Sequence, residues 1–462
     1  MNAVHAIRMS ALLAAAAWLC ACSTPGHDAK PTELPLPAQW IHAGGSAEIT
    51  PQWWLQFDDP QLHRLIEEAL RSNLDLRQAV ARLDEARATA RAQHGSEWPQ
   101  VAFTAGGERM QSINVVTGRP YIQTVHQEEF QAAYEVDLFG RVAALSAAAD
   151  ASSVAFEATR DAVELSVTTA VAATYVNLLS LDAQLDQARQ TLVTRERTVQ
   201  LNRSRERTGY GSTLETAQAE AEMYATAQTI PLLELARQRQ ELALNVLLGR
   251  PPGPIERNPA LLEAPQHTLP SAGVPSLLLR RRPDLVALEY QLVAADEQFA
   301  ASRAQLLPSV QLGVALGRAS SSVLPPGAPY TIWSVGGSVL APLFTGGRLR
   351  ALADASGSRR DQVLIAYERA VLNAFAEVET QLYAYDRLHE QTLQAVEQRR
   401  ATAESLRVSH RRFEQGYGSF LDELLAQRNL FTVDLQLIQL RADRLNTELA
   451  VIKALGGGWK TE

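Results

Sequence analysis

The chain has 462 residues, of which 46% are hydrophobic and 20% charged, and its formal net charge is −8. This acidic balance excludes a nucleic-acid partner, because binding to phosphates needs a basic face that displaces counterions. Aromatic residues make up only 6%, whereas alanine and glutamine are frequent. This composition favours long helices packed through small side chains over one large core.

Residues 1–21 are interpreted as an export signal. Arg8 gives a short basic start, and the uncharged apolar run that ends at Leu19 is too short to span a bilayer. The run continues as Leu19-Cys20-Ala21-Cys22, which resembles the lipobox of bacterial lipoproteins, where cleavage precedes a cysteine that becomes diacylated. The favoured lipid acceptor is Cys22, and an ordinary signal peptide with two incidental cysteines is the alternative.

Residues 22–52 are predicted to be a linker between the lipid and the folded part, since the segment up to about Trp40 is polar and rich in proline. Both cysteines of the chain lie at or before Cys22, so the sequence predicts no disulfide framework and no thiolate metal site. The nine histidines show no helical metal-ligand spacing, and the common hydrolase motifs do not occur. The prediction is a chain without catalytic residues, metal or cofactor.

The rest of the chain is an internal repeat. Gly209-Tyr210-Gly211-Ser212 recurs as Gly416-Tyr417-Gly418-Ser419, and Leu248-Gly249 recurs as Leu455-Gly456, both 207 residues later. We therefore predict two equivalent repeats at residues 53–252 and 283–459, joined by a linker at 253–282.

Each repeat shows the same order of hydrophobic periodicities. In the first repeat these predict a helix, two strands, a long helix and a returning helix at residues 62–93, 101–116, 121–137, 141–208 and 213–248. In the second repeat the same elements are predicted at residues 283–306, 310–320, 330–343, 348–415 and 420–455. Each half therefore consists of a strand pair and a helical hairpin whose tip is Gly-Tyr-Gly-Ser.

The strand segments alternate between apolar and polar residues. Phe130, Tyr134 and Val136 alternate with Gln131 and Glu135, which indicates strands with two different environments. Such strands are long enough to cross an outer membrane when tilted. Four of them cannot close a barrel, and open edges are not tolerated in hydrocarbon. Several chains must then share one barrel, and a small soluble sheet under the helices is the alternative.

The long helices show small and apolar residues at steps of three and four, the pattern of a coiled-coil seam. A helix of ~67 residues reaches about 100 Å, so these helices must stand side by side as a bundle or tube. At each tip the second glycine is expected to take a positive φ, and the serine is expected to cap the returning helix.

The chain resembles the outer-membrane factors of tripartite efflux systems, of the TolC and OprM type, within the NodT-like lipoprotein branch. The motifs that carry this resemblance are Trp53-Trp54, Tyr134-Glu135-Val136-Asp137-Leu138-Phe139-Gly140-Arg141, Arg281-Arg282-Pro283-Asp284-Leu285 and Ala454-Leu455-Gly456-Gly457-Gly458-Trp459. The resemblance implies a homotrimer in the outer membrane, with a twelve-stranded barrel and a helical tunnel through the periplasm. It also implies two partners: a periplasmic adaptor protein and an inner-membrane pump of the RND type.

The resemblance also implies working residues at the hairpin tips. Leu421 and Asp422 fall on positions that ring the tunnel constriction in relatives, and Leu425 stands where several relatives have aspartate. Glu423 is expected to supply charge instead, since an acidic ring favours cations. The alternative is that both acids simply occupy the first turn of a helix, where they suit the dipole.

The two tips, Gly209–Ser212 and Gly416–Ser419, are expected to contact the adaptor. The alternative is that their residues only form the turns.

The predicted function is a passive exit duct for small toxic compounds. A lipid-anchored periplasmic coiled-coil scaffold without channel activity is the alternative. The basic cluster Arg280-Arg281-Arg282 is interpreted as a structural junction between the repeats.

Overall fold

The computed structural model describes residues 37–42, 44–47, 49–263, 269–322 and 329–459. Cys22 and the export signal lie outside the described residues. The chain forms two compact units, each described by itself. The strand unit contains Arg82–Glu157 and Ala287–Glu368, and the hairpin unit contains the described parts of Leu34–Ala81, Ala158–Val286 and Arg369–Glu462.

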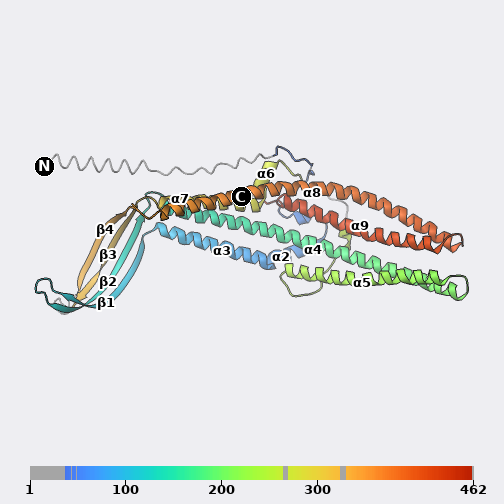
Figure 1. Cartoon of the computed structure of the whole chain (residues 1–462), viewed down its shortest axis with the longest axis horizontal. Coiled ribbons are helices and arrows are strands. Elements are labelled where there is room, and N and C mark those ends of the chain that lie inside the picture. The colour runs from blue at the N-terminus through green and yellow to red at the C-terminus, as the bar shows by residue number, and fades with distance from the viewer. Residues whose placement is uncertain (1–36, 43, 48, 264–268, 323–328, 460–462) are drawn as a thin grey trace. The chain divides into compact units, whose positions relative to one another are not determined.

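The strand unit contains one antiparallel sheet, with two strands from each half of the chain (Figure 1). The strands are β1 (Gln100–Ile113), β2 (Pro120–Val136), β3 (Ser309–Ser321) and β4 (Tyr330–Leu340), in that order. The remainder of both units is mainly helical. The predicted fold class, long helical hairpins with a small four-stranded part, is confirmed.

Two strands end earlier than the sequence suggested. Asn114 forms a turn after β1, because its Oδ1 accepts hydrogen bonds from the N–H groups of Val116 and Thr117, at 3.0 and 3.1 Å. Strand β4 ends at Leu340, two residues before Pro342, whose nitrogen has no hydrogen to donate to a strand ladder.

The helices of the first half are α2 (Pro60–Ser72), α3 (Leu74–His94), α4 (Arg141–Arg207) and α5 (Thr213–Leu247). Those of the second half are α6 (Pro275–Arg281), α7 (Pro283–Ala304), α8 (Arg348–Glu414) and α9 (Phe420–Ala454). Short 3₁₀ turns are η1 (Trp53–Gln56), η2 (Gly95–Glu97) and η3 (Pro259–Glu263). The segment 253–282, expected to be a linker, thus contains η3 and α6.

The prediction of one continuous helix at 62–93 is wrong, because Asn73 separates α2 from α3. Its backbone is extended, with ψ of 132°, and its side chain serves both neighbours. The Asn73 Oδ1 accepts from the N–H of Leu76 at 2.9 Å, and its Nδ2 donates to the carbonyl of Leu247 at 2.8 Å. The break therefore fixes α2 and α3 against the end of α5.

Two glycines show that the repeats pack alike. Gly249, after α5, has φ of 67°, and a Cβ there would lie 2.2 Å from the Ser72 carbonyl oxygen. Gly456, after α9, has φ of 91°, and a Cβ there would lie 2.1 Å from the Arg281 carbonyl oxygen. Only glycine fits these positions. In each half the returning helix ends against the short helix of the same half.

Of the basic cluster before α7, Arg282 forms a structural junction. Its largely buried side chain donates to Asp284 at 2.9 Å and to Glu377 of α8 at 2.6 Å. It also donates to the carbonyl of Ala454 at 3.2 Å. Its five donors thus tie α7, α8 and the end of α9 together.

The core of the hairpin unit surrounds α4. Trp53, Trp54 and Phe57 pack against the buried middle of α4, with Tyr175 at its centre. The Tyr175 hydroxyl donates to Asp59 at 3.2 Å and accepts from the N–H of Asn258 at 2.8 Å, and burial raises its pKa. By length and composition alone one stretch of α4 could span a membrane, but half of it is buried. The apolar character of α4 is accounted for by this core.

The chain before the core docks on α8. Glu379 accepts hydrogen bonds from the N–H of Ile41 at 2.7 Å and from the N–H of His42 at 3.3 Å. The ring of Trp40 lies 5.6 Å from that of Phe375, one helical turn along α8. A single carboxylate thus holds the start of the described chain on one face of α8.

The next residues, Gly44–Ala47, pair with the segment before α6. The N–H of Gly45 donates to Pro270 at 3.0 Å, and the N–H of Ala47 donates to Leu269 at 3.2 Å. A Cβ on Gly45 would lie 1.7 Å from the Leu269 carbonyl oxygen. We call Trp40–His42 with Gly44–Ala47 the strap. It binds both α8 and the segment between the repeats.

Candidate functional site

The two hairpin tips have the same backbone. After α4, the N–H groups of Tyr210 and Gly211 both donate to the Arg205 carbonyl, at 2.8 and 3.1 Å. After α8, the N–H groups of Tyr417 and Gly418 donate to Arg412 at 2.9 and 3.0 Å in the same way. These backbone hydrogen bonds form an ordinary C-terminal cap, which pairs carbonyl groups at the end of each long helix.

The roles of the tip glycines differ from the expectation. The positive φ belongs to the first glycine of each tip, 76° at Gly209 and 77° at Gly416, and not to the second. The second glycine is needed for close approach. A Cβ on Gly211 would lie 3.0 Å from that of Arg205, and one on Gly418 would meet Arg412 at 2.9 Å.

The serines cap the returning helices, as predicted. Ser212 accepts from the N–H of Glu215 at 3.2 Å and donates its own N–H to the Glu215 side chain, a complete capping box. Ser419 accepts from the N–H of Leu421 at 3.1 Å. Tyr210 and Tyr417 are 84% and 86% exposed, so both tips present a free aromatic ring.

The four expected gate residues do not share one face. Leu421, Asp422 and Leu425 are exposed on the first turns of α9, whereas Glu423 is 3% exposed. The Glu423 carboxylate accepts from Gln427 at 3.0 Å and lies 2.8 Å from Nδ1 of His410 on α8. Glu423 thus sits inside the hairpin and adds no charge to its described surface.

His410 is held by two acids. Besides Glu423, its Nε2 lies 3.3 Å from Glu414 on α8. The hydrogen bond to Glu423 raises the pKa of His410, and the nearby charges of Glu423 and Glu414 raise it further against the effect of burial. In its protonated form the imidazole balances the charge of the buried carboxylate. Sequence reasoning missed His410, because a single histidine on a long helix has no distinguishing spacing.

Near the tips the two hairpins are joined through Glu222 of α5. Within the first hairpin, the Arg195 guanidinium of α4 is 5% exposed and donates to Glu222 at 3.0 Å and to the Thr226 hydroxyl at 2.5 Å. Arg428 of α9 contacts the other oxygen of Glu222 at 3.3 Å. Closer to the tips, the Arg205 guanidinium lies 4.5 Å from the ring of Phe413.

The sheet has one apolar and one polar face. Phe103, Phe130, Leu316 and Trp333 are directly paired across the four strands, so they share one face. All four are more than half exposed, and the rings of Phe103 and Phe130 lie 5.0 Å apart. Such an exposed apolar row would be a liability in water and suits a lipid environment.

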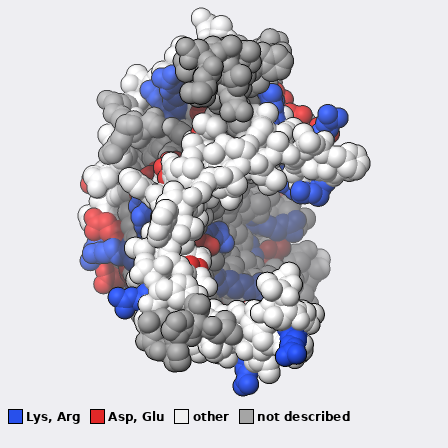
Figure 2. Space-filling model, turned by 90° about the vertical axis from the view of Figure 1, so that its left-hand side faces the viewer, with Lys and Arg blue, Asp and Glu red and all other residues white. Residues whose placement is uncertain are grey.

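The opposite face carries small, amide and acidic side chains, the acids including Glu129 and Glu135. Gln131 lies between Ala102 and Ala315 in the register. On the apolar face, the row beyond Phe130 contains the paired Glu128 and Arg318, which end the apolar band. Figure 2, viewed from the end at which the strands lie in Figure 1, shows that most of the described surface there is uncharged.

Comparison with known proteins agrees with these features. The sequence profile of the outer membrane efflux protein family matches residues 65–250 and 274–457. The chain is 31% identical over 464 residues to the pyoverdine export outer membrane protein OpmQ of Pseudomonas aeruginosa, covering 98% of this chain and 97% of that protein.

Solved structures agree as well. The outer-membrane channel OprN superposes with a TM-score of 0.84 at 28% identity, covering 92% of this chain and 99% of that one. The open state of the MtrE outer membrane channel of Neisseria gonorrhoeae gives a TM-score of 0.82 at 30% identity, with 93% and 97% covered.

The chain belongs to the outer membrane efflux protein family. It is the outer-membrane channel component of an efflux system, located in the outer membrane with a tunnel reaching into the periplasm. The family is one of channels rather than enzymes. The relatives do not favour the alternative of a scaffold without channel activity.

Proposed function

We propose that three copies of this chain form one closed duct through which an inner-membrane pump of the RND type, coupled by a periplasmic adaptor, passes small toxic compounds out of the cell. The duct itself is passive, and its wall catalyses no reaction. Residues 53–252 and 283–459 act as the two repeats of each copy, so a ring of three contains six hairpins. The observation that carries the proposal is the open sheet with one apolar face.

Strands β1 and β4 are the edges of this sheet, and within the described residues each pairs on one side only. Unpaired backbone N–H and C=O groups cost several kcal/mol each in hydrocarbon, in the range of about 2–7 kcal/mol. Pairing β1 of one copy with β4 of the next removes both edges. Three copies then supply the twelve strands that the resemblance implies.

The hairpin unit supports the same head-to-tail arrangement. In this unit α5 and α8 both expose apolar side chains: on α5 these are Tyr224, Leu232, Leu235, Leu242 and Val246, and on α8 they are Leu372, Tyr383, Leu393 and Val396. Burial against a second copy would cover them.

Pore formation by the purified protein tests the proposal. We expect a detergent-requiring, heat-modifiable trimer by analytical ultracentrifugation, and stepwise conductance in planar bilayers. A monomer that is extracted by urea after protease release from its lipid, and that forms no pores, would support the scaffold instead. Deletion of the gene should lower the minimum inhibitory concentrations of compounds handled by the pump.

The lipid anchor is a separate proposal. Acylation of Cys22 would hold the mature chain at the membrane by its linker at residues 22–52. Radioactive palmitate should label the wild-type protein, and Cys22→Ser should abolish the label, whereas Cys20→Ser should leave it intact. Equal labelling of both variants contradicts the assignment.

The tips are proposed to contact the adaptor, because Tyr210 and Tyr417 are free while the glycines beside them are fixed by the turn. We expect Tyr210→Ala and Tyr417→Ala to weaken adaptor binding measured by surface plasmon resonance. The control is Trp98→Ala, an exposed aromatic residue of the strand unit, away from the tips. Equal affinity of all variants contradicts the contact.

The constriction is proposed at Leu421, Asp422 and Leu425, which are exposed on α9. A ring of Asp422 carboxylates would favour cations. Asp422→Asn should lower the cation preference of single channels, whereas Glu215→Gln, at the equivalent position of the first repeat, should not. Combined replacement of Asp422 and Glu423 by alanine with unchanged conductance and selectivity would exclude an acidic gate.

A further inference from the structure

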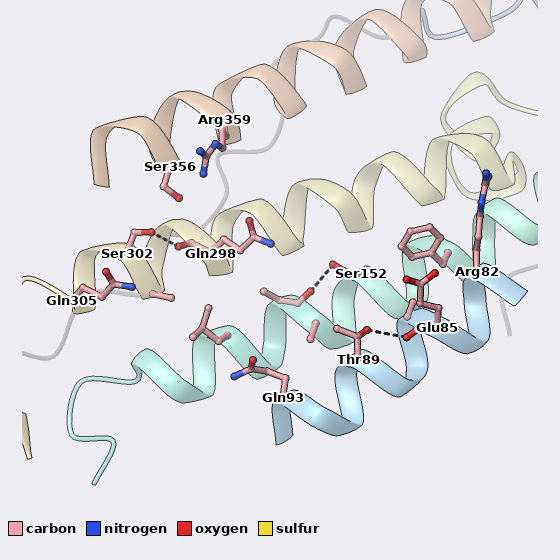
Figure 3. Close-up of a pocket in the computed structure, with 16 residues that line it drawn as sticks. Arg82, Glu85, Thr89, Gln93, Ser152, Gln298, Ser302, Gln305, Ser356 and Arg359 are labelled. Carbon is pink, nitrogen blue, oxygen red and sulfur yellow. Dashed lines mark hydrogen bonds between the residues drawn. The ribbon is translucent and has the colours of Figure 1, made fainter. Parts of the chain in front are cut away.

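A groove of about 700 Å³ runs along the helices of the strand unit. Figure 3 shows that α3, α4, α7 and α8 each contribute one face to it. Most of its side chains are polar, and three glutamines contribute to the lining: Gln93 on α3, Gln298 on α7, and Gln305 directly after α7. A volume of this size is in the range of small-molecule sites, about 300–1,000 Å³.

Ion pairs join the helices that line the groove. Arg87 joins α3 to Glu157 of α4 at 3.1 Å, and Arg360 joins α8 to Asp296 of α7 at 2.7 Å. A second hollow of about 520 Å³ continues between α4, α7 and α8, and the two hollows share Phe156. Because α3, α4, α7 and α8 each turn one face to the hollow, this face of the strand unit is concave. A closed ring of three copies would have its concave faces on the inside. The location of the groove on the inner wall therefore rests on the proposed function.

Two guanidinium groups in the groove are unpaired. Arg82 of α3 and Arg359 of α8 are exposed, and neither has an ion pair or a hydrogen bond with any residue in the described part of the chain. Their neighbours Arg87 and Arg360 are both paired with acids. The one carboxylate in the lining is Glu85, so the groove has a net charge of about +1 per copy in a chain of net charge −8.

Three of the hydroxyl groups of the groove are already engaged. Thr89, Ser152 and Ser302 donate to carbonyls of their own helices at 2.8 to 3.0 Å (Figure 3). The groups left to bind an anionic solute are therefore the two guanidiniums, the glutamine amides and the hydroxyl of Ser356. The ring of Phe156, 39% exposed, adds an apolar surface.

We propose that this groove is an anion-binding station on the inner wall of the duct, which takes oxygen-rich anionic solutes such as polycarboxylates. Arg82 and Arg359 would bind carboxylate oxygens, because the planar guanidinium matches a carboxylate with two parallel hydrogen bonds. Both side chains are exposed to water, which keeps each contact weak. Weak binding suits transit, since a solute held in a duct must also leave it.

Single-channel recording tests the proposal. With a KCl gradient across the bilayer, Arg82→Gln/Arg359→Gln should lower the chloride-to-potassium permeability ratio about two-fold or more. Citrate is the solute probe: it should reduce the current of the wild-type channel, and the double variant should need about ten-fold more citrate for the same block. Arg82→Lys/Arg359→Lys, which keeps the charge, should retain the permeability ratio.

The matched control is Arg91→Gln/Arg350→Gln. Arg91 lies nine residues after Arg82, and Arg350 lies nine residues before Arg359, so each is on the opposite side of its helix. The control removes the same charge outside the groove. If the groove and control variants show equal permeability ratios and equal citrate block, the proposed anion binding in the groove is wrong, while the proposed duct is not contradicted. Absence of pores in the wild-type protein overturns the proposed function, and the station with it.

Discussion

Replacing His410 by alanine would leave the carboxylate of Glu423, 3% exposed, with Gln427 as its remaining hydrogen-bond partner. A hydrogen bond to a charged group contributes about 1.5–3 kcal/mol. Because the side chain of His410 is 51% exposed, solvent screening reduces this to about 1–2 kcal/mol. Opening of the second tip should then become about 5- to 30-fold more frequent.

The same pair predicts a dependence on pH. The pKa of His410 is raised in the folded chain above its ordinary value of about 6.5. Its contribution to stability is therefore complete below pH ~6.5 and is lost as the pH rises through the raised pKa. The second tip should be tightest in mildly acidic medium and should loosen in alkaline medium.

Limited trypsin digestion of the detergent-solubilised protein measures this opening, because Arg411 and Arg412 lie in the last turn of α8. When opening is fast relative to cleavage, the cleavage rate follows the population of the open form. The first tip provides an internal control, since Arg205 and Arg207 end α4 and no histidine lies near them in the sequence. Mass spectrometry identifies which tip is cut at each pH.

We expect the ratio of second-tip to first-tip cleavage to rise with pH in the wild-type protein. In His410→Ala the ratio should be high at every pH, and Glu423→Gln should also remove the pH dependence. A ratio that changes with pH equally in all three proteins would refute the reasoning, because the histidine would then not control the tip.

Three further variants test the packing. Gly45→Ala should release the strap, visible as faster hydrogen exchange at residues 269–272, whereas Gly253→Ala, whose Cβ has no contact closer than 3.9 Å, should not. Gly456→Ala should cost more than about 2 kcal/mol, seen as a lower Tm, because strain and a backbone clash add; a Tm equal to that of Gly253→Ala contradicts this. Arg195→Ala should cost about 1.5–3 kcal/mol, since Glu222 loses a buried charged partner and keeps the exposed Arg428. Arg197 is exposed, so Arg197→Ala should change the stability by less than about 0.5 kcal/mol. Equal losses of stability in the Arg195 and Arg197 variants would exclude a stabilising role of the Arg195–Glu222 ion pair.

The helical hairpins and the sheet follow from local patterns. Periodicities of two and of three to four residues predict the strands and the long helices, because one face of each element has a different environment along its whole length. The break at Asn73 and the short helix α6 could not be predicted in this way. Both depend on contacts with residues distant in the sequence, such as the carbonyl of Leu247.

The residues at the second tip show the same limit. Sequence reasoning treated Asp422 and Glu423 as equivalent acids, because both follow Ser419 in the first turn of α9. The structure separates them, since only Glu423 faces α8 and meets His410. Which of two adjacent residues faces the partner helix depends on the packing angle between the helices, which the sequence of one helix does not state.

The proposed acylation of Cys22 would make the strap limit how far the hairpin unit can lie from the membrane. With Cys22 acylated, 18 residues join the lipid to Trp40, which is fixed on α8 next to Phe375. A fully extended chain of that length spans at most about 60–65 Å. The length of the segment from Cys22 to Trp40 thus sets the greatest distance from the membrane at which Glu379 can still bind the strap. Shortening it residue by residue should leave export intact until the chain is taut, and then release the strap from α8.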